Sequence, residues 1–457
     1  MLMLQTTERK ENKMGIMPVH KLLINMSVPM MISMLVMALY NIIDSIFVSQ
    51  INENALTALS LAFPIQNFMI AIANGTGVGI NSLLSRSLGE KNYKEVNACA
   101  TNGIFISFIS SILFAIFGVF FAETYMLSQT DNPEIILYGT QYLRIISLFS
   151  IGVFMEITFE RIIQSAGNTV YSMITQITGA VINIILDPIM IFGYFGFPAM
   201  GITGAALATV IGQIGAAALS IFFNLKKNPE VHITFKKFKP SVKTIKDIFA
   251  VGAPSFLMQS IGSVLTLFLN KLLIQFSTTA VSVLGVYFKL QSFIFMPVFG
   301  INNGMVPIIA YNYGARNKKR IMDTLKFSIF GATIIMVLGF AIFQLFPIQL
   351  LKLFNATPAM LEIGVPALRI ISLCFVFAGF CIVVGSMFQA LGNGLFSLIN
   401  SITRQLILIL PAAYLLSRTF GLTAIWFAYP IAEIGSLIIT IFFLKRIYNQ
   451  KIRPLED

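Results

Sequence analysis

Apolar runs long enough to cross a lipid bilayer recur along this chain and constrain its fold more than any other feature. The stretch from Ile104 to Phe121 is one example, and a transmembrane helix needs roughly 20 such residues. Only 11% of the 457 residues are charged, whereas a soluble domain carries about a quarter. Such a chain cannot cover a water-exposed surface with polar groups, but its apolar side chains suit a surface that faces lipid. The sequence therefore predicts an all-α integral membrane protein.

The apolar runs predict about twelve transmembrane helices. We expect them at residues 19–50, 55–85, 96–121, 134–158, 163–192, 199–224, 245–275, 279–310, 321–346, 360–383, 387–416 and 421–446. Every second loop is rich in Lys and Arg, whereas the loops between them carry only Lys352 and Arg418. Because positive loops stay in the cytoplasm, we expect a multi-pass protein of the cell membrane with both termini cytoplasmic. The richness in Ile, Lys and Asn favours a bacterial source.

The chain also repeats itself. The segment YLRIISL at 142–148 recurs as ALRIISL at 367–373, and QSAGN at 164–168 recurs as QALGN at 389–393. Five single residues follow the same offset of 225 (254 − 29 = 225), namely the pairs Pro29/Pro254, Gln66/Gln291, Gly79/Gly304, Gly89/Gly314 and Pro133/Pro358. Near the end the offset becomes 220, where GITGAA at 201–206 faces GLTAIW at 421–426. The repeat predicts two parallel six-helix halves about an axis along the membrane normal.

This repeat sets the expected domain organisation. A cytoplasmic segment (1–18) precedes a first lobe (19–225), and a basic cytoplasmic linker (226–244) leads to a second lobe (245–446) and a cytoplasmic tail (447–457). Two such bundles can enclose a central cavity, which favours a transporter over a duplicated channel or a membrane-embedded enzyme. The two histidines lie at the N-terminal end (His20) and in the central loop (His232), and no phosphate-binding loop occurs, so we expect no catalysis and no ATP hydrolysis. We expect no cofactor. We also expect no nucleic-acid partner, because the basic residues sit mostly in short loops between the spans.

A few polar residues interrupt the apolar runs of the first half. Asp44 lies in the first span, and Asn183 and Asp187 lie four residues apart in the fifth, so these two share one helix face. A carboxylate at a helix centre costs about 2.5–3.5 kcal/mol. With Thr203 on the sixth span, these groups lie roughly 6–12 Å below the outer surface at 1.5 Å per residue. They predict a site for Na⁺ or for a proton, although each Asp could instead cap a neighbouring helix.

The second half lacks these residues. Leu269 stands at the position of Asp44 (44 + 225 = 269), and Ala412 at that of Asp187 (187 + 225 = 412). The predicted ion site therefore belongs to the first half alone. Three further features carry weaker expectations: Lys289 as a cavity residue, Arg404 and Glu433 as a pair across the last two spans, and Glu156, Glu160 and Arg161 as a solvated or paired cluster.

Several strings resemble the multidrug and toxic compound extrusion (MATE) family over essentially the whole chain. They are NIILDP at 183–188, GITGAALAT at 201–209 and a first span that carries Pro29, Tyr40 and Asp44. The DinF-like/MepA-like branch is the most similar, because its acidic residues lie in the N-lobe. The resemblance implies two lobes in a V and alternating access. It also implies a monomer that exports lipophilic, often cationic drugs and toxins in exchange for Na⁺ or H⁺.

The resemblance assigns roles residue by residue. Asp44, Asn183 and Asp187 match the family's N-lobe cation site, and Thr203 is our choice for its sixth-span hydroxyl, with Thr209 as the substitute if the alignment slips. Pro29 and Tyr40 match positions linked to bending of the first helix and to the cavity lining. The acidic C-lobe site of another branch has no counterpart here. The alternative function is a flippase for a lipid-linked or polysaccharide precursor.

Overall fold

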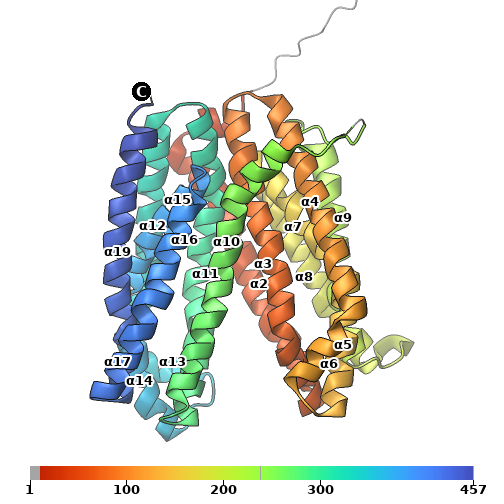
Figure 1. Cartoon of the computed structure of the whole chain (residues 1–457), viewed down its shortest axis with the longest axis vertical. Coiled ribbons are helices and arrows are strands. Elements are labelled where there is room, and N and C mark those ends of the chain that lie inside the picture. The colour runs from red at the N-terminus through yellow and green to blue at the C-terminus, as the bar shows by residue number, and fades with distance from the viewer. Residues whose placement is uncertain (1–10, 237, 456–457) are drawn as a thin grey trace, which may run out of the picture.

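The computed structural model describes residues 11–236 and 238–455, and these are helical apart from turns and connecting loops. Within the described residues, ten helices are long and apolar enough to cross a membrane, or twelve when each of two bent helix pairs is one span. Figure 1 shows them as two bundles side by side, which meet near the C-terminus and diverge toward the opposite end. The predicted membrane fold and its V shape are thereby confirmed.

The first bundle, called the N-lobe here, is built from α2 to α9 and is preceded by a short α1. Its helices are α1 (Lys13–Ile16), α2 (Val19–Ser49), α3 (Glu53–Gly89), α4 (Tyr93–Phe120), α5 (Ala122–Gln129), α6 (Pro133–Leu148), α7 (Ile151–Ser165), α8 (Thr169–Phe192), η1 (Tyr194–Gly196) and α9 (Ile202–Lys227).

The second bundle, the C-lobe, follows the segment between Lys227, where α9 ends, and Val242, where α10 begins. Its helices are α10 (Val242–Leu273), α11 (Thr278–Gly314), α12 (Lys318–Leu345), α13 (Pro347–Lys352), α14 (Pro358–Ser372), α15 (Phe375–Ala390), α16 (Gly394–Ile402), η2 (Thr403–Ile409), α17 (Leu410–Phe420), α18 (Leu422–Ile425), α19 (Ala428–Ile447) and η3 (Tyr448–Ile452).

Two spans that we expected to be continuous are bent. The fourth is α6 plus α7 at 45°, and the tenth is α14 plus α15 at 51°. The breaks fall at equivalent positions to within one residue, since α7 begins at Ile151 and α15 begins at Phe375 (151 + 225 = 376). In the C-lobe, the Arg369 carbonyl accepts from Gln344 Nε2 at 2.8 Å and from the Ser372 hydroxyl at 3.0 Å. Side chains that bond into the helical ladder in this way are a known cause of kinks.

Close helix contacts join the lobes at the end that carries the C-terminus. A Cβ on Gly89 of α3 would collide with the Tyr311 carbonyl of α11, and a Cβ on Gly314 of α11 would collide with the Arg86 carbonyl of α3. These contacts are mirror images in the repeat (86 + 225 = 311, 89 + 225 = 314). Farther along, Gly75 of α3 packs against the backbone of Gly252 in α10. The repeated glycines of the sequence are therefore the points where the two backbones touch.

A short N-terminal segment, Asn12–Met17, spans both lobes at this same end. Asn12 Nδ2 donates to the Ala166 carbonyl of the N-lobe at 3.0 Å. From the C-lobe, Arg320 Nη2 donates to the carbonyls of Met14 and Met17 at 2.9 and 2.8 Å. Met14 itself is fully buried. This N-terminal tie adds hydrogen bonds to the helix contacts, so the lobes are held together at one end while they diverge at the other (Figure 1).

Candidate functional site

A buried polar cluster lies in the N-lobe between α2, α8 and α9. Asp187 and Asn183 of α8 are 0% and 2% exposed. Asp44 of α2 lies close enough to Asp187 for the two carboxyl groups to interact directly through their charges. The Tyr40 hydroxyl, one turn before Asp44, lies beside Thr209 of α9 and is influenced by both carboxyl groups. The structure thus brings together Asp44, Asn183, Asp187 and Tyr40 from segments far apart in the sequence.

Glycines explain why α9 reaches this cluster. Gly212 of α9 packs on the carbonyl of Gly179 in α8, and a Cβ there would also meet Asn183 Cβ at 3.3 Å. With no side chains between them, the two backbones approach closely enough for Asn183 Nδ2 to donate to Thr209 Oγ1 at 3.2 Å. The Thr209 hydroxyl in turn donates to the Ala205 carbonyl at 3.0 Å. Helix packing therefore presents the Thr209 oxygen to the cluster with its proton turned away.

The cluster contains more acceptors than donors. Asn183 Oδ1 and both carboxylate oxygens of Asp187 are buried and have no hydrogen-bond partner among the described residues. Leaving a buried acceptor unsatisfied costs about 1–3 kcal/mol, and more for a charged group. A proton or a cation would satisfy several of these oxygens at once. Carboxylate, amide and hydroxyl oxygens are the ligands that hard cations prefer, so the donor set fits Na⁺ as well as H⁺.

The hydroxyl in the cluster belongs to Thr209 and not to Thr203. The Thr203 hydroxyl donates instead to Gln141 Oε1 of α6 at 3.4 Å. The two threonines are six residues apart, which is about 9 Å along a helix, and they point to different faces. Thr209, the alternative to Thr203 in the sequence analysis, is therefore the threonine that lies beside Asn183.

Two neighbours of the cluster, Tyr142 and Gln66, are not among the site residues that the sequence predicts. Tyr142 of α6 interacts electrostatically with Asp44 and Asp187, and its hydroxyl donates to Gln66 Oε1 of α3 at 3.3 Å. In the sequence, Gln66 stands out as a member of the repeat with Gln291. Its polarity inside an apolar span was a signal for the site, whereas Tyr142 gave none, because tyrosine is common near membrane surfaces.

From this cluster, polar side chains continue along α8 toward its N-terminus, at the end of the molecule where the lobes meet. Gln176 Nε2 donates to Glu160 Oε2 of α7 at 2.8 Å, and Gln164 Nε2 donates to the Ser172 hydroxyl at 2.6 Å. Glu160 is 4% exposed, so it is buried and not solvated; its Oε2 accepts the hydrogen bond from Gln176, whereas its Oε1 has no hydrogen-bond partner among the described residues. Its neighbour Arg161 donates to Asn303 Oδ1 of the C-lobe at 3.0 Å, which makes it part of the contact between the lobes.

Pro29 and Lys289 lie away from the cluster. Pro29 is inside α2 and buried, between Ser27 and Met31, which pack against Gly304 and Gly300 of α11. It therefore belongs to the region where the lobes meet, about 22 Å along the helix from Asp44 at 1.5 Å per residue. Lys289 is exposed and its ammonium lies 5.9 Å from the centre of the Phe354 ring.

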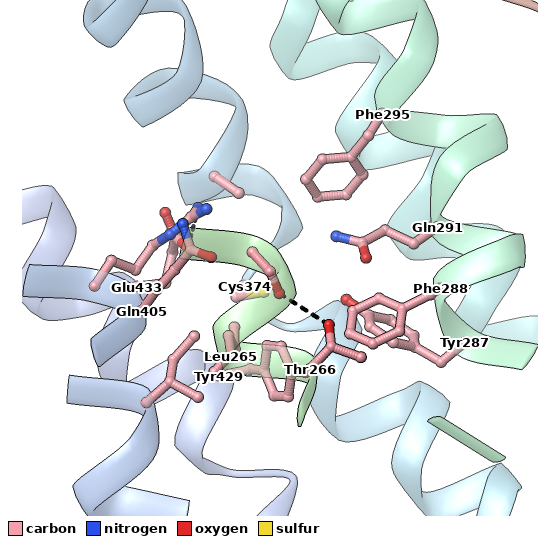
Figure 2. A pocket seen from close by; sticks show the side chains of 14 residues that line it. Leu265, Thr266, Tyr287, Phe288, Gln291, Phe295, Cys374, Gln405, Tyr429 and Glu433 are labelled. Carbon is pink, nitrogen blue, oxygen red and sulfur yellow. Dashed lines mark hydrogen bonds and ion pairs between the residues drawn. The ribbon is translucent and has the colours of Figure 1, made fainter. Parts of the chain in front are cut away.

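The C-lobe contains a cavity of about 150 Å³ between α10, α11, α15, η2 and α19. Figure 2 shows the side chains of Gln291 and Phe295 on one side of this space and those of Gln405 and Glu433 on the other. Arg404 Nη1 lies 3.3 Å from Glu433 Oε2, so the predicted pair across the last two spans is confirmed. Lys289 does not line this cavity, although its neighbours in α11 do.

The repeat relates this C-lobe cavity to the N-lobe cluster. Gln291, which lines the cavity, is the repeat equivalent of Gln66, which lies near the cluster (66 + 225 = 291). Tyr429, also in the lining, is the equivalent of Thr209 at the later offset (209 + 220 = 429). Leu265, also in the lining, stands at the position of Tyr40 (40 + 225 = 265). Each lobe therefore holds a polar site between equivalent helices.

Comparison with known sequences supports the duplicated architecture. A family model described as MatE matches the chain twice, at residues 29–189 and 254–415, with starts 225 residues apart (254 − 29 = 225). The multidrug export protein MepA of Staphylococcus haemolyticus (strain JCSC1435) is 28% identical to the chain over 433 residues, which cover 94% of each.

Comparison with solved structures supports the same architecture. The outward-facing conformation of a multidrug resistance MATE family transporter of the MOP superfamily has a TM-score of 0.90 and 27% identity, covering 96% of this chain and 98% of that one. A MOP superfamily transporter from Pyrococcus furiosus Vc1 (DSM3638) has a TM-score of 0.90 and 26% identity, over the same shares of each chain. The reverse polarity of that protein's binding pocket is described as suggesting a different function. Since the two match equally well, the fold alone does not select the cargo.

Proposed function

The chain belongs to the MatE family of membrane transporters, and we propose that it is a secondary active antiporter that exports lipophilic, often cationic, small molecules in exchange for Na⁺ or H⁺. Export of several drugs follows the name of its relative, a multidrug export protein, and the lipophilic, often cationic character of the cargo is part of our proposal. We further propose that it acts as a monomer, with both termini in the cytoplasm of a bacterial cell. It is a transporter and not an enzyme.

The surplus of buried acceptors in the N-lobe cluster carries this proposal. Export against a gradient needs a source of energy, and the chain contains no ATP-binding loop. One positive charge that enters down a membrane potential supplies about 2.3 kcal/mol per 100 mV. At about 1.4 kcal/mol per tenfold ratio, that sustains a gradient of roughly 40-fold for an uncharged cargo. A monocationic cargo exchanged one for one moves no net charge, so its export draws on the concentration gradient of the ion. A cation that binds Asp44, Asn183 and Asp187 is therefore a sufficient driving ion.

The contacts between the lobes favour alternating access as the mechanism. The lobes touch through Gly89, Gly314 and the N-terminal tie at one end and diverge at the other. With the basic loops in the cytoplasm, the open end faces outward. A bound ion can bias this state against an inward-open one only if its affinities for the two states differ. α2 links the ion site to the contact between the lobes, because it carries Asp44 near one end and contacts α11 near the other.

Transport assays in vesicles test the coupling. We expect ethidium efflux to be driven by an imposed Na⁺ gradient, a pH gradient, or both, which identifies the ion. Asp44→Asn and Asp187→Asn remove one carboxylate each with little change of shape and should reduce ion-driven efflux at least tenfold. Asp131→Asn alters an exposed acid in the loop before α6 and serves as the matched control. Full ion-driven efflux in both cluster variants would refute the proposal.

A flippase for a lipid-linked or polysaccharide precursor is the alternative cargo assignment. Anionic precursors need unpaired cationic side chains in the cavity. The arginine that lines the C-lobe cavity is already paired with Glu433, and Lys289 lies outside that cavity. A thermal-shift screen of lipid-linked sugar diphosphates against lipophilic cations decides between the two. Stabilisation by the diphosphates alone would favour the flippase.

A further inference from the structure

A row of polar side chains on α7 faces α8 between the N-lobe cluster and the end where the lobes meet, and the ion coupling described above gives it no role. We propose that Glu160 in this row binds a second exchanged proton, so that two protons enter for each monocation exported. The inference rests on the proposed ion-driven export and deepens it by naming the proton as a driving ion and Glu160 as a residue that carries it.

The row on α7 follows from helical spacing. Glu156, Glu160 and Gln164 are four residues apart, so they share one face of the helix. Two of them bond to α8 in order along its length. Gln164 Nε2 donates to the Ser172 hydroxyl at 2.6 Å, and Glu160 Oε2 accepts from Gln176 Nε2 at 2.8 Å. The row therefore runs along the interface of α7 and α8, from the end where the lobes meet toward the N-lobe cluster.

Glu156 connects this row to the cluster. Its Oε1 lies 3.7 Å from the place that a Cβ on Gly179 would take, so the glycine leaves room for the carboxyl group against α8. Gly179 is one turn before Asn183 on the same helix face. The charges of Glu156 and Glu160 interact with each other. A proton that leaves a carboxyl oxygen of Glu156 can therefore be taken up by a carboxylate oxygen of Glu160, directly or through one water, and no other bond changes.

Glu160 is the member of the row with an unsatisfied carboxyl oxygen. The residue is 4% exposed, and its Oε1 is buried with no hydrogen-bond partner among the described residues. The Oε1 of Gln176, whose amide nitrogen donates to the other carboxyl oxygen, has no partner in this part of the chain either. A buried carboxylate with an unsatisfied oxygen is costly, and a proton on Glu160 removes its charge. Hard metal cations take about six or more oxygen ligands, so these two oxygens suit a proton better.

The charges that act on Glu160 belong to its own helix. Glu156 and Arg161 interact with it through their charges, and its partner from α8 is the neutral amide of Gln176. The other helices packed against this part of α7, which are α3, α4, α9 and α11, meet it through uncharged residues, namely Gly77, Ser107, Asn224 and Asn303. The protonation of Glu160 therefore depends on the nearby acid and on where the Arg161 guanidinium lies.

Arg161 gives Glu160 a different proton affinity in the two states of the transporter. Its side chain crosses Gly77 of α3, where a Cβ would meet Arg161 Cγ at 2.7 Å. Its Nη1 donates to Gln164 Oε1 at 3.1 Å and to Asn303 Oδ1 of the C-lobe at 3.0 Å. While the lobes touch, these two amides hold the guanidinium and Glu160 keeps its proton. When the lobes separate here, Arg161 loses Asn303 and can pair with Glu160, which then releases the proton to the cytoplasm. This is the difference in affinity that coupling requires.

The second copy of the bundle lacks the acid row. Cys381 stands at the position of Glu156 (156 + 225 = 381), and Gly385 stands at that of Glu160 (160 + 225 = 385). Ser386 takes the place of Arg161 (161 + 225 = 386). The architecture of the bundle therefore does not require these charges, and they occur only in the copy that holds the ion cluster.

A second proton changes the electrical balance of export. One proton exchanged for one monocation moves no net charge, whereas two protons carry one net positive charge inward for each cargo molecule. A membrane potential of 100 mV, negative on the cytoplasmic side, then adds roughly 40-fold to the cargo gradient that the protein can sustain. Glu160 therefore makes the export of a monocation sensitive to the membrane potential.

Counting protons and cargo in the same proteoliposomes tests the proposal on the full-length protein. Enclosed pyranine reports the protons, and ethidium fluorescence reports the cargo. We expect two protons per ethidium for the wild type and one for Glu160→Gln, which keeps the size of the side chain but cannot exchange a proton. A potential of 100 mV set with K⁺ and valinomycin should accelerate ethidium export by the wild type about threefold or more, and should not accelerate it in Glu160→Gln. Glu362→Gln, the same substitution at an exposed acid of α14, should behave as the wild type.

Infrared spectroscopy keeps the test decisive if Glu160→Gln folds poorly. The C=O stretching band of a buried protonated carboxyl group should remain in Asp44→Asn/Asp187→Asn, which lacks both acids of the cluster. Asn303→Ala leaves Glu160 in place and should weaken that band at a given pH, because Arg161 is then free to pair with Glu160. Glu160→Asp should shift the band and keep the response to potential. One proton per ethidium in the wild type, an unchanged count in a folded Glu160→Gln, or a band that neither Asn303→Ala nor Glu160→Asp alters would overturn the proposal.

The same measurements separate this inference from the export function. If the wild type exports ethidium under a Na⁺ gradient without moving protons, or moves one proton per ethidium, the second proton is wrong and the export function stands. If the infrared band titrates and weakens in Asn303→Ala, yet no ion gradient drives ethidium export, the export function is wrong and proton binding at Glu160 stands alone.

Discussion

The N-lobe cluster and the C-lobe cavity occupy equivalent places in two copies of one six-helix unit, but their charges are balanced in opposite ways. The cluster holds two carboxyl groups and an amide oxygen with no basic side chain, and three of its oxygens have no partner among the described residues. The cavity holds a carboxylate whose cation, Arg404, is part of the chain. One site therefore has unpartnered acceptors that an exchangeable cation can satisfy, and the other has a permanent cation, so the two copies of the unit have diverged in charge.

The largest expected effect lies in the C-lobe. Arg404→Gln should lower the free energy of unfolding by about 3–5 kcal/mol, because it leaves the Glu433 carboxylate buried without its partner. The double variant Arg404→Gln/Glu433→Gln should recover much of that loss. Chemical denaturation of both variants in nanodiscs measures the difference. If Arg404→Gln were as stable as the wild type, the pair of Arg404 and Glu433 would be accessible to water. The two sites would then differ less in their need for a cation than the structure shows.

Ion binding should affect stability through the N-lobe alone. If Na⁺ is the driving ion, Na⁺ at 100 times its dissociation constant should stabilise the wild type by about 2.7 kcal/mol. Asp187→Asn should lose this stabilisation, whereas Tyr429→Phe in the C-lobe cavity should keep it. Thermal unfolding with NaCl against choline chloride at constant ionic strength measures it. An absent Na⁺ effect combined with pH-driven efflux would assign the cluster to protons.

The hydroxyl of the cluster can be identified by a matched pair of substitutions. Thr209→Val should weaken ion binding about tenfold, or about 1.4 kcal/mol, because it removes an oxygen beside Asn183. Thr203→Val, the same change on the same helix, should have no such effect because that hydroxyl donates to Gln141. The ion dependence of ethidium efflux reports both. Equal effects would place both hydroxyls at the ion site in some state of the transport cycle.

The smallest expected effect is a change of stability without bound ion. In Na⁺-free buffer at neutral pH, Asp187→Asn should leave the protein as stable as the wild type or stabilise it by up to about 1 kcal/mol. The substitution removes a charge whose oxygens have no partners and introduces an N–H group that can donate to Asp44. Thermal unfolding of the two proteins side by side measures this. A marked loss of stability would show that the Asp187 charge is structural, as Arg404 is.

Much of this architecture was predictable because hydrophobicity and charge act locally. The spans follow from runs of apolar residues, and the repeat follows from pairs at a constant offset, of which the glycine pairs proved to be contacts between the lobes. Asp44, Asn183 and Asp187 stand out because lipid rejects them. The pair of Arg404 and Glu433 stands out for the same reason, and the structure joins it.

Other features depend on contacts between segments and could not be read locally. The bends at α6/α7 and α14/α15 lie within continuous apolar runs, and in the C-lobe a side chain of another helix, Gln344, bonds into the bend. The choice of Thr209 over Thr203 depends on how far α9 slides along α8, which the contact between Gly179 and Gly212 sets.

The sequence by itself determined that this chain crosses the bilayer as two copies of one bundle, and which charged residues those bundles must shelter. The reason is that the cost of exposing polar groups to lipid depends on residue type and position along the chain. Only the tertiary structure decided which of these groups face one another, because that depends on helix register and rotation. Asp44 and Asp187 come from helices about 140 residues apart (187 − 44 = 143). The packing of α2 against α8 and of α8 against α9 brings Asp44, Asp187 and Thr209 together in one site.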